Sequence, residues 1–142
     1  MLYTVSCAEK TEEVGYALAK LLDERKIKRA YIAMNGEMGV GKTVFVRGFA
    51  SYFGIVGVKS PTYTVVNEYR ANGIRIFHFD LYRIEDSDDL YSIGYDDYIA
   101  EDGFSLVEWS EKAEGEIPEG ALTVSISRTN NEEERIIEIL GV

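Results

Sequence analysis

The stretch that most constrains this chain of 142 residues is a glycine-rich segment at residues 36–43, which reads Gly-Glu-Met-Gly-Val-Gly-Lys-Thr. It matches in full the phosphate-binding loop pattern of Gly, any four residues, Gly, Lys and Ser or Thr. In such a loop, backbone N–H groups and a helix N-terminus surround phosphates, the lysine neutralises them and the hydroxyl binds Mg²⁺. We therefore expect the whole segment to bind a nucleotide through Gly36, Glu37, Met38, Gly39, Val40, Gly41, Lys42 and Thr43.

The sequence on either side of the loop predicts the strand and the helix that a phosphate loop must join. Residues 29–34 form a short apolar run that suits a strand buried on both faces. After the loop, Phe45, Phe49 and Phe53 recur at every fourth position, which predicts a helix that ends near Gly54. An earlier strand at residues 2–5 and a helix after it complete the start of an α/β fold with a parallel sheet.

The start of that first helix is indicated by a capping-box pattern, with Ser6 as the cap and Glu9 three residues later. In the acidic segment at residues 85–102, Tyr91, Tyr95 and Tyr98 are spaced as on a helix, which we expect to be broken near Gly94. This segment is either a solvated face over tucked aromatic side chains or a docking surface for a partner.

Two hairpins are expected later in the chain. The first joins residues 63–70 to residues 74–82 through the tight turn Asn72-Gly73, and the second joins residues 122–127 to residues 135–140. We therefore expect one domain over residues 1–142, with a three-layer α/β fold like that of P-loop NTPases. Its central sheet should be mostly parallel, with an antiparallel hairpin strand and a C-terminal hairpin.

Hydrolysis or transfer of a phosphate also needs a carboxylate that holds the metal ion. Asp80 and Glu108 each end an apolar run that reads as a strand, and in open α/β sheets ligands lie beyond the carboxyl ends of the strands. A carboxylate buried there without a cation would be unfavourable. We interpret Asp80, Glu108 and Lys42 as the catalytic set, and Thr43, Glu108 and Asp80 as the residues that hold Mg²⁺.

The segment Ser60-Pro61-Thr62 precedes the first hairpin and is interpreted as a switch loop that senses the γ-phosphate, although it also suits an ordinary turn. His78 shares a strand face with Asp80; a hydrogen-bonded core residue is the favoured reading over a general base. Arg83 could stabilise charge in the transition state, although a surface salt bridge is the favoured reading.

The charge of the chain argues against tight, direct binding of nucleic acid. The formal net charge is -10, and 13 Asp or Glu residues accompany the single Lys112 between Glu85 and Glu119. Such a surface repels a phosphate backbone. Cys7 is the only cysteine, so no internal disulfide can form, and no apolar run approaches a membrane span. We expect a cytoplasmic protein with no membrane association.

Two missing motifs bear on the base of the nucleotide. None of the lysines lies in the Asn/Thr-Lys-any-Asp motif by which small GTPases read guanine, and Asp80 does not begin an Asp-any-any-Gly switch because position 83 is arginine. Adenine is favoured by elimination, so the expected cofactors are ATP and Mg²⁺.

Four motifs together resemble a known family. They are the loop at residues 36–43, Val-Lys-Ser-Pro-Thr-Tyr-Thr at 58–64, His-Phe-Asp-Leu-Tyr-Arg at 78–83 and Leu-Val-Glu-Trp at 106–109. In this order and spacing they are similar to those of the TsaE (YjeE) family of bacterial ATPases. The family loop commonly reads Asp-Leu-Gly-Ala where this chain has Glu37-Met38-Gly39-Val40, a mild departure.

The resemblance implies a low-activity ATPase that acts with the TsaB and TsaD proteins in making threonylcarbamoyladenosine in tRNA, and that meets tRNA only indirectly. It also implies the residue roles given above, and it places Trp109 near the nucleotide. Thr11 and Arg135 would approach the adenosine side, although their local matches are weak. Two alternatives stay open: a small phosphotransferase that acts on a metabolite, and a nucleotide-dependent binding module without turnover. The acidic segment after Asp80 argues against the phosphotransferase, because metabolite kinases commonly carry several arginines in a lid there.

Overall fold

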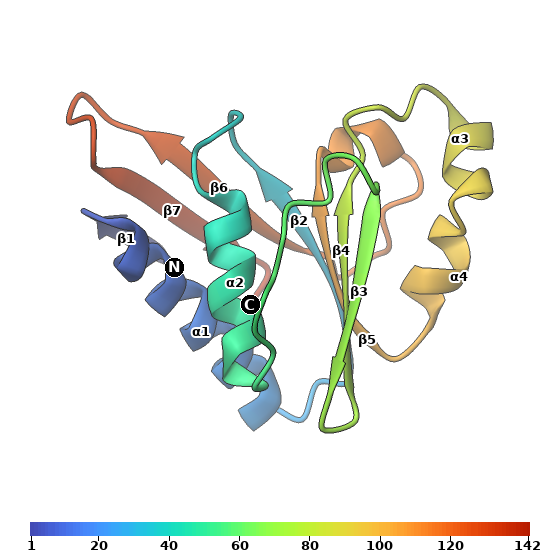
Figure 1. The fold of residues 1–142 in the computed structure, drawn as a ribbon, viewed down its shortest axis with the longest axis horizontal. Helices are drawn as coiled ribbons and strands as arrows, with labels where there is room; N and C mark the ends of the chain where they lie inside the picture. Colours follow the sequence, from blue (N-terminus) through green and yellow to red (C-terminus); the bar gives the residue numbers. More distant parts are fainter.

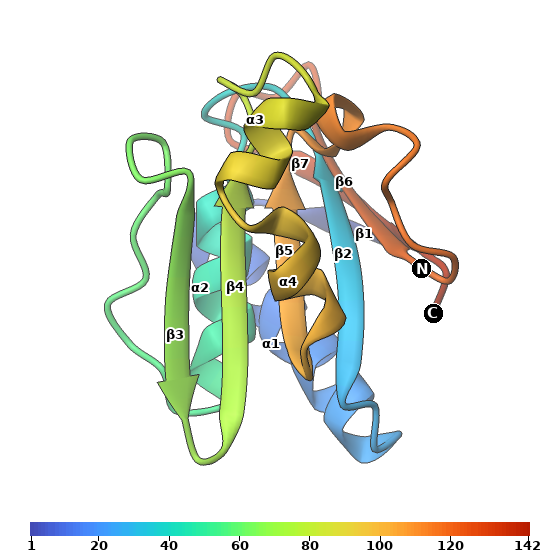
Figure 2. The ribbon, with the colours of Figure 1, turned by 90° about the vertical axis from the view of Figure 1, so that its right-hand side faces the viewer.

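The computed structural model describes residues 1–142 and shows three layers, with a seven-stranded sheet between two groups of helices (Figure 1). Helices α1 (Ala8–Glu24) and α2 (Lys42–Tyr52) cover one face, and α3 (Ser87–Ser92), α4 (Tyr95–Ala100) and the 3-10 turn η1 (Ser110–Ala113) cover the other (Figure 2). The strands are β1 (Leu2–Val5), β2 (Arg29–Asn35), β3 (Val66–Ala71), β4 (Ile74–Asp80), β5 (Gly103–Glu108), β6 (Leu122–Arg128) and β7 (Arg135–Leu140).

The order of the strands across the sheet is β1-β7-β6-β2-β5-β4-β3. The four central strands β6, β2, β5 and β4 are parallel to one another, whereas β3, β7 and β1 add antiparallel pairs at the two sides. The predicted α/β fold and both hairpins are therefore confirmed. Asn72 and Gly73 have φ angles of 53° and 79°, as the tight turn between β3 and β4 requires.

The first strand does not lie in the parallel part of the sheet, where the strand-helix-strand pattern predicts it. β1 does not join the parallel core but pairs antiparallel with β7 at the edge, where Tyr3 faces Ile137. Helix α1 also begins one residue later than the capping-box pattern predicts, because Cys7 rather than Ser6 occupies the cap position and no side chain caps the helix. Glu9 is consequently the second residue of α1, one position short of the capping-box geometry.

The larger core lies between the sheet and the two long helices. The predicted stripe on α2 is confirmed, since Phe45 and Phe49 are fully buried and Phe53 stacks on Phe104 of β5. On the opposite face, Gly94 separates α3 from α4 as predicted, with a φ of 78°. None of the helices is both long enough and apolar enough to cross a bilayer.

Helices α1 and α2 pack unusually closely because a glycine on each faces the backbone of the other. A Cβ atom added to Gly48 would lie 2.6 Å from the carbonyl carbon of Glu12, and one added to Gly15 would lie 3.2 Å from that of Phe45. Any side chain at either position would therefore push the helices apart. Since α2 begins at Lys42, this contact also sets where the end of the phosphate loop lies.

Candidate nucleotide-binding site

The glycine-rich segment forms a tight loop between β2 and α2. Gly36 leaves the strand with a φ of 150°, and a Cβ there would lie 2.6 Å from the carbonyl oxygen of Ile126 and 2.8 Å from a methyl of Val40. Only glycine fits this position. Gly41 then occupies the cap position of α2, so the N-terminus of this helix opens at the loop. A helix N-terminus presents free N–H groups and partial positive charge, which suit a phosphate.

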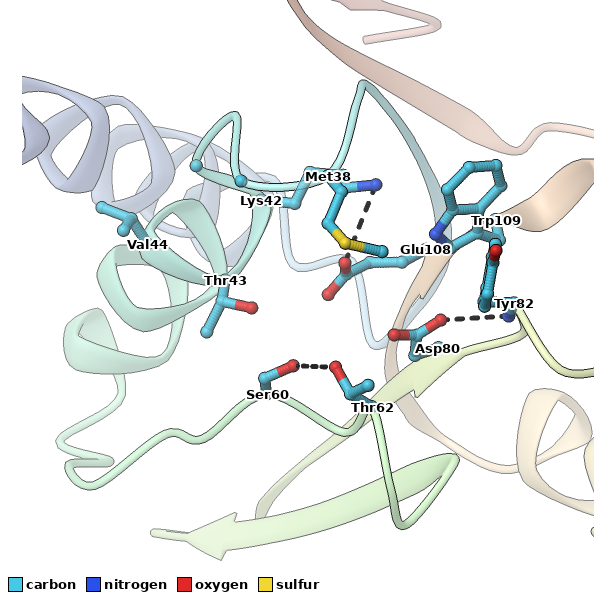
Figure 3. Close-up of a pocket in the computed structure, with 12 residues that line it drawn as sticks. Met38, Lys42, Thr43, Val44, Ser60, Thr62, Asp80, Tyr82, Glu108 and Trp109 are labelled. Carbon is cyan, nitrogen blue, oxygen red and sulfur yellow. Dashed lines mark hydrogen bonds and ion pairs between the residues drawn. The ribbon is translucent and has the colours of Figure 1, made fainter.

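A cavity of about 340 Å³ opens beside the loop at the carboxyl ends of β4 and β5 (Figure 3). It brings together residues from the loop, the switch segment and both strand ends, which are far apart in the sequence. Its lining consists of Met38, Gly39, Gly41, Lys42, Thr43, Val44, Ser60, Thr62, Asp80, Tyr82, Glu108 and Trp109.

Lys42 is only 5% exposed and is held from three sides. Its ammonium group donates to the carbonyl oxygen of Gly36 at 2.7 Å and lies 3.9 Å from a carboxylate oxygen of Glu108. It also lies 5.0 Å from the ring centre of Trp109, in a cation–π contact (Figure 3). The cation is thus fixed at the wall of the cavity, within reach of an anion beside the loop.

Asp80 and Glu108 are register partners on the neighbouring parallel strands β4 and β5, so their side chains enter the cavity together. They are 8% and 6% exposed, and Asp80 accepts a hydrogen bond from the backbone N–H of Tyr82 at 3.0 Å. Two buried carboxylates face one ammonium, which leaves an excess of negative charge that a divalent cation would neutralise.

The donor set fits Mg²⁺ shared with a phosphate. Asp80, Glu108 and the hydroxyl of Thr43 line the same cavity and offer only oxygen atoms, which Mg²⁺ prefers. No group of three or more His, Cys, Asp or Glu side chains in the chain could hold a metal ion alone. Two carboxylates and a hydroxyl agree with an ion that takes its remaining ligands from phosphates and water.

The switch segment lies across the cavity from the loop. The hydroxyls of Ser60 and Thr62 are 2.6 Å apart and line the cavity, while Pro61 between them is buried (Figure 3). The N–H of Val65 donates to the carbonyl of Pro61, and the carbonyl of Val65 accepts from the N–H of Asp80, both at 2.8 Å. Val65 has a φ of 70°, which is strained for a β-branched residue. Movement of this segment would therefore act directly on Asp80.

A second cavity, of about 170 Å³, lies on the other side of the loop and shares Gly39, Gly41 and Val44 with the first. Thr11 and Arg135 both line it, although they belong to α1 and β7. Arg135 donates to the carbonyl oxygens of Val40, Glu132 and Glu134 at 3.2, 2.7 and 2.9 Å. Its guanidinium therefore ties the loop to the β6–β7 connection and forms one wall of this cavity.

Two sequence candidates lie outside the main cavity. His78 is fully buried and does not line it, in agreement with the reading as a hydrogen-bonded core residue rather than a general base. Arg83 also does not line it, and it forms no salt bridge; its guanidinium lies 5.1 Å from the ring centre of Tyr63. The expected salt bridge was wrong, because the guanidinium lies instead beside Tyr63, an exposed side chain that follows the switch segment.

Tyr82 lines the cavity as well and was not among the residues predicted from the sequence; its ring centre lies 5.0 Å from that of Trp109. The available signals were its position two residues after Asp80 and its place in the motif at residues 78–83. Trp109 itself has a left-handed backbone, with a φ of 58°, which turns its ring back over Lys42. Such a conformation cannot be read from a tryptophan in a sequence.

The fold and the loop together define a P-loop protein, the class of α/β proteins that bind nucleotide phosphates at such a loop. Within this class, the sequence model of the family described as "Threonylcarbamoyl adenosine biosynthesis protein TsaE" matches residues 5–137. The chain belongs to the TsaE family, which works in the biosynthesis of threonylcarbamoyladenosine in tRNA, and the resemblance of its four motifs is confirmed.

Comparisons with individual relatives support the same family. The chain is 46% identical to the tRNA threonylcarbamoyladenosine biosynthesis protein TsaE of Haemophilus influenzae over 77% of this chain and 68% of that protein. It is 36% identical to the protein of the same name from Bacillus subtilis, over 84% of this chain and 75% of the relative. The crystal structure of YdiB from Bacillus subtilis superposes with a TM-score of 0.78 at 28% identity, covering 96% of this chain and 82% of that one.

Proposed function

We propose that this protein binds ATP with Mg²⁺ and hydrolyses it slowly, and that this turnover serves the TsaB and TsaD proteins in threonylcarbamoyladenosine modification of tRNA. The observation that carries the proposal is the convergence of Lys42, Thr43, Asp80 and Glu108 on one cavity beside the phosphate loop. Membership of the TsaE family supports the pathway. We place the protein in the cytoplasm, where tRNA is modified.

Each residue has a task in this proposal. The loop N–H groups and Lys42 bind the β- and γ-phosphates, and the hydroxyl of Thr43 with Asp80 and Glu108 holds Mg²⁺. When bound, the ion neutralises charge on the phosphates and orients them. Ser60 and Thr62 face the end of the triphosphate and sense the γ-phosphate. The adenosine lies on the side of the second cavity, against Thr11 and Arg135, while Trp109 covers Lys42.

A slow intrinsic rate follows from the lining of the main cavity. No arginine lines it, although efficient phosphoryl transfer commonly uses one to stabilise charge in the transition state. The acidic surface of the chain suits contact with basic partner surfaces better than contact with tRNA. We therefore propose that the partner proteins, rather than this chain, contact tRNA and accelerate the turnover of ATP.

The test is release of phosphate from ATP by the purified protein, measured alone, with TsaB and TsaD, and with tRNA added. We expect slow, Mg²⁺-dependent release that changes when the partners are present. Asp80→Asn and Glu108→Gln should each lower the rate at least about tenfold, because even outer-shell partners of a metal ion matter this much. Asp97→Asn removes an exposed carboxylate on α4 and should leave the rate unchanged.

Wild-type turnover in both site variants would refute the proposed chemistry. Transfer of the γ-phosphate to a metabolite rather than to water would replace it with a phosphotransferase. Binding of ATP without metal-dependent release of phosphate would leave only a nucleotide-dependent binding module.

A further inference from the structure

His78 is the only histidine of the chain, and it lies wholly inside the protein. Its Nε2 atom is 2.5 Å from a carboxylate oxygen of Glu108, Oε2, across the pair of strands β4 and β5. Its other ring nitrogen, Nδ1, is buried and has no hydrogen-bond partner. The ring therefore makes one polar contact, and that contact goes to a residue of the candidate metal site.

The chemistry of the pair fixes which atom donates. An ionised carboxylate can only accept, so Nε2 of His78 must carry a proton and donate it to Oε2 of Glu108. This hydrogen bond holds Oε2 of Glu108 toward the interior of the protein, where His78 lies. The other oxygen, Oε1, lies 3.9 Å from the ammonium of Lys42, at the cavity. One carboxylate oxygen is thus anchored, and the other is left to face a ligand.

A purely structural role does not account for a histidine at this position. Its strand neighbours on the same face include Ile76, and its register partner on β5 is Leu106; both are fully buried. An apolar side chain would fill such a place without leaving Nδ1 unpartnered, which destabilises a folded protein. The contact with Glu108 is the one interaction that an apolar residue could not supply.

We propose that His78 is a positioning residue that fixes the side chain of Glu108 and thereby sets the affinity of the site for Mg²⁺; this rests on the proposed function. Ligands of a metal ion are usually held by such outer contacts, and loss of one typically lowers metal affinity by about 10- to 100-fold. His78 does not touch the nucleotide or take part in proton transfer, because it does not line the cavity.

The hydrogen bond itself can be tested without any ligand. Because there is a single histidine, a long-range ¹H–¹⁵N correlation spectrum shows one imidazole, whose tautomer can be assigned without ambiguity. We expect the proton on Nε2, with a downfield resonance that moves upfield in Glu108→Gln. A ring protonated only at Nδ1 would overturn the proposal.

The effect on metal binding is tested with two variants of His78. His78→Gln keeps an N–H donor near the position of Nε2, whereas His78→Leu removes the donor and fills a similar volume. Fluorescence of Trp109, the only tryptophan, reports Mg²⁺ titrations at saturating ATP, and ATP affinity in excess EDTA is measured by calorimetry. Thermal unfolding of each variant confirms that it is folded.

We expect His78→Leu to raise the Mg²⁺ concentration at half-saturation about tenfold or more, with ATP affinity in EDTA unchanged. His78→Gln should stay within about threefold of the wild type, since it restores the donor. Equal Mg²⁺ half-saturation in the wild type and His78→Leu would overturn the positioning role while leaving the proposed function intact. A wild type that shows no Mg²⁺-dependent ATP binding would overturn the proposed function, and with it the role of His78.

Discussion

Replacing Gly48 with alanine should damage both the stability and the nucleotide site of this protein. The added Cβ would lie 2.6 Å from both the Cα and the carbonyl carbon of Glu12, where ordinary contacts of this kind need at least about 3.4 Å. Because the obstacle is backbone, no side-chain rotation can relieve the clash. Helix α2 must instead move away from α1 by about 1 Å.

The expected cost follows from two opposing effects. Overpacking of this kind destabilises by about 1–3 kcal/mol, and a backbone clash lies at the upper end. Alanine gains about 1 kcal/mol over glycine in the interior of a helix. We therefore expect Gly48→Ala to lower the free energy of unfolding by about 2 kcal/mol. Since α2 begins at Lys42 and Thr43, the same shift of about 1 Å should cut ATP turnover by up to about 100-fold.

Urea unfolding followed by circular dichroism measures the first effect, and phosphate release at saturating ATP measures the second. Arg47→Ala is the matched control, because Arg47 is the neighbouring exposed residue and only pairs with Glu12 at 3.6 Å. It should cost no more than about 1 kcal/mol and leave turnover unchanged. A Gly48→Ala protein as stable as the wild type, with normal turnover, would refute the reasoning.

Two further predictions concern other parts of the structure. Burial, followed by a hydrogen bond between their hydroxyls, raises the pKa of Tyr31 above its usual value, and burial also raises the pKa of Tyr95. Both groups favour the folded state fully below about pH 10, the usual pKa of tyrosine, and this contribution is lost as the pH rises further. Urea unfolding should show a lower free energy of unfolding at pH 11 than at pH 8 in the wild type, and a smaller loss over the same range in Tyr31→Phe; equal losses would contradict the cause. Arg135→Ala frees the carbonyl of Val40 in the loop and should weaken ATP binding about threefold to tenfold in calorimetry. Arg128→Ala serves as a comparison, because Arg128 donates to the carbonyl of Met38 in the same loop at 3.2 Å.

Much of the fold could be predicted because its signals are local. The stripe of Phe45 and Phe49, the Asn72-Gly73 turn and the break at Gly94 each depend on a few neighbouring residues, and each is confirmed. Pairing between distant segments carries no such signal. The place of β1 beside β7 depends on contacts across almost the whole chain, so a run of four residues could not reveal it.

In the candidate site, too, some features could be predicted from the sequence and others could not. Asp80 and Glu108 could be placed at one edge from sequence, because parallel strands bring their carboxyl ends together and the two residues are register partners. The contact of Lys42 with Trp109 could not be predicted from the sequence, since it depends on a left-handed backbone at the tryptophan. The hydrogen bond between His78 and Glu108 could not be predicted either, because it joins side chains whose rotamers are set only by packing.

The central claim is that the loop and the two strand-end carboxylates form a Mg²⁺-dependent ATP site. The most direct measurement is calorimetric titration of ATP into the wild type and Lys42→Ala, each with Mg²⁺ and with EDTA, with the exposed Lys20→Ala on α1 as control. We expect Mg²⁺ to strengthen binding in the wild type and in Lys20→Ala, and Lys42→Ala to bind about 10- to 100-fold more weakly, as loss of a charged hydrogen bond implies. Equal affinity in Lys42→Ala and the wild type, or no binding in the wild type at all, would contradict the account.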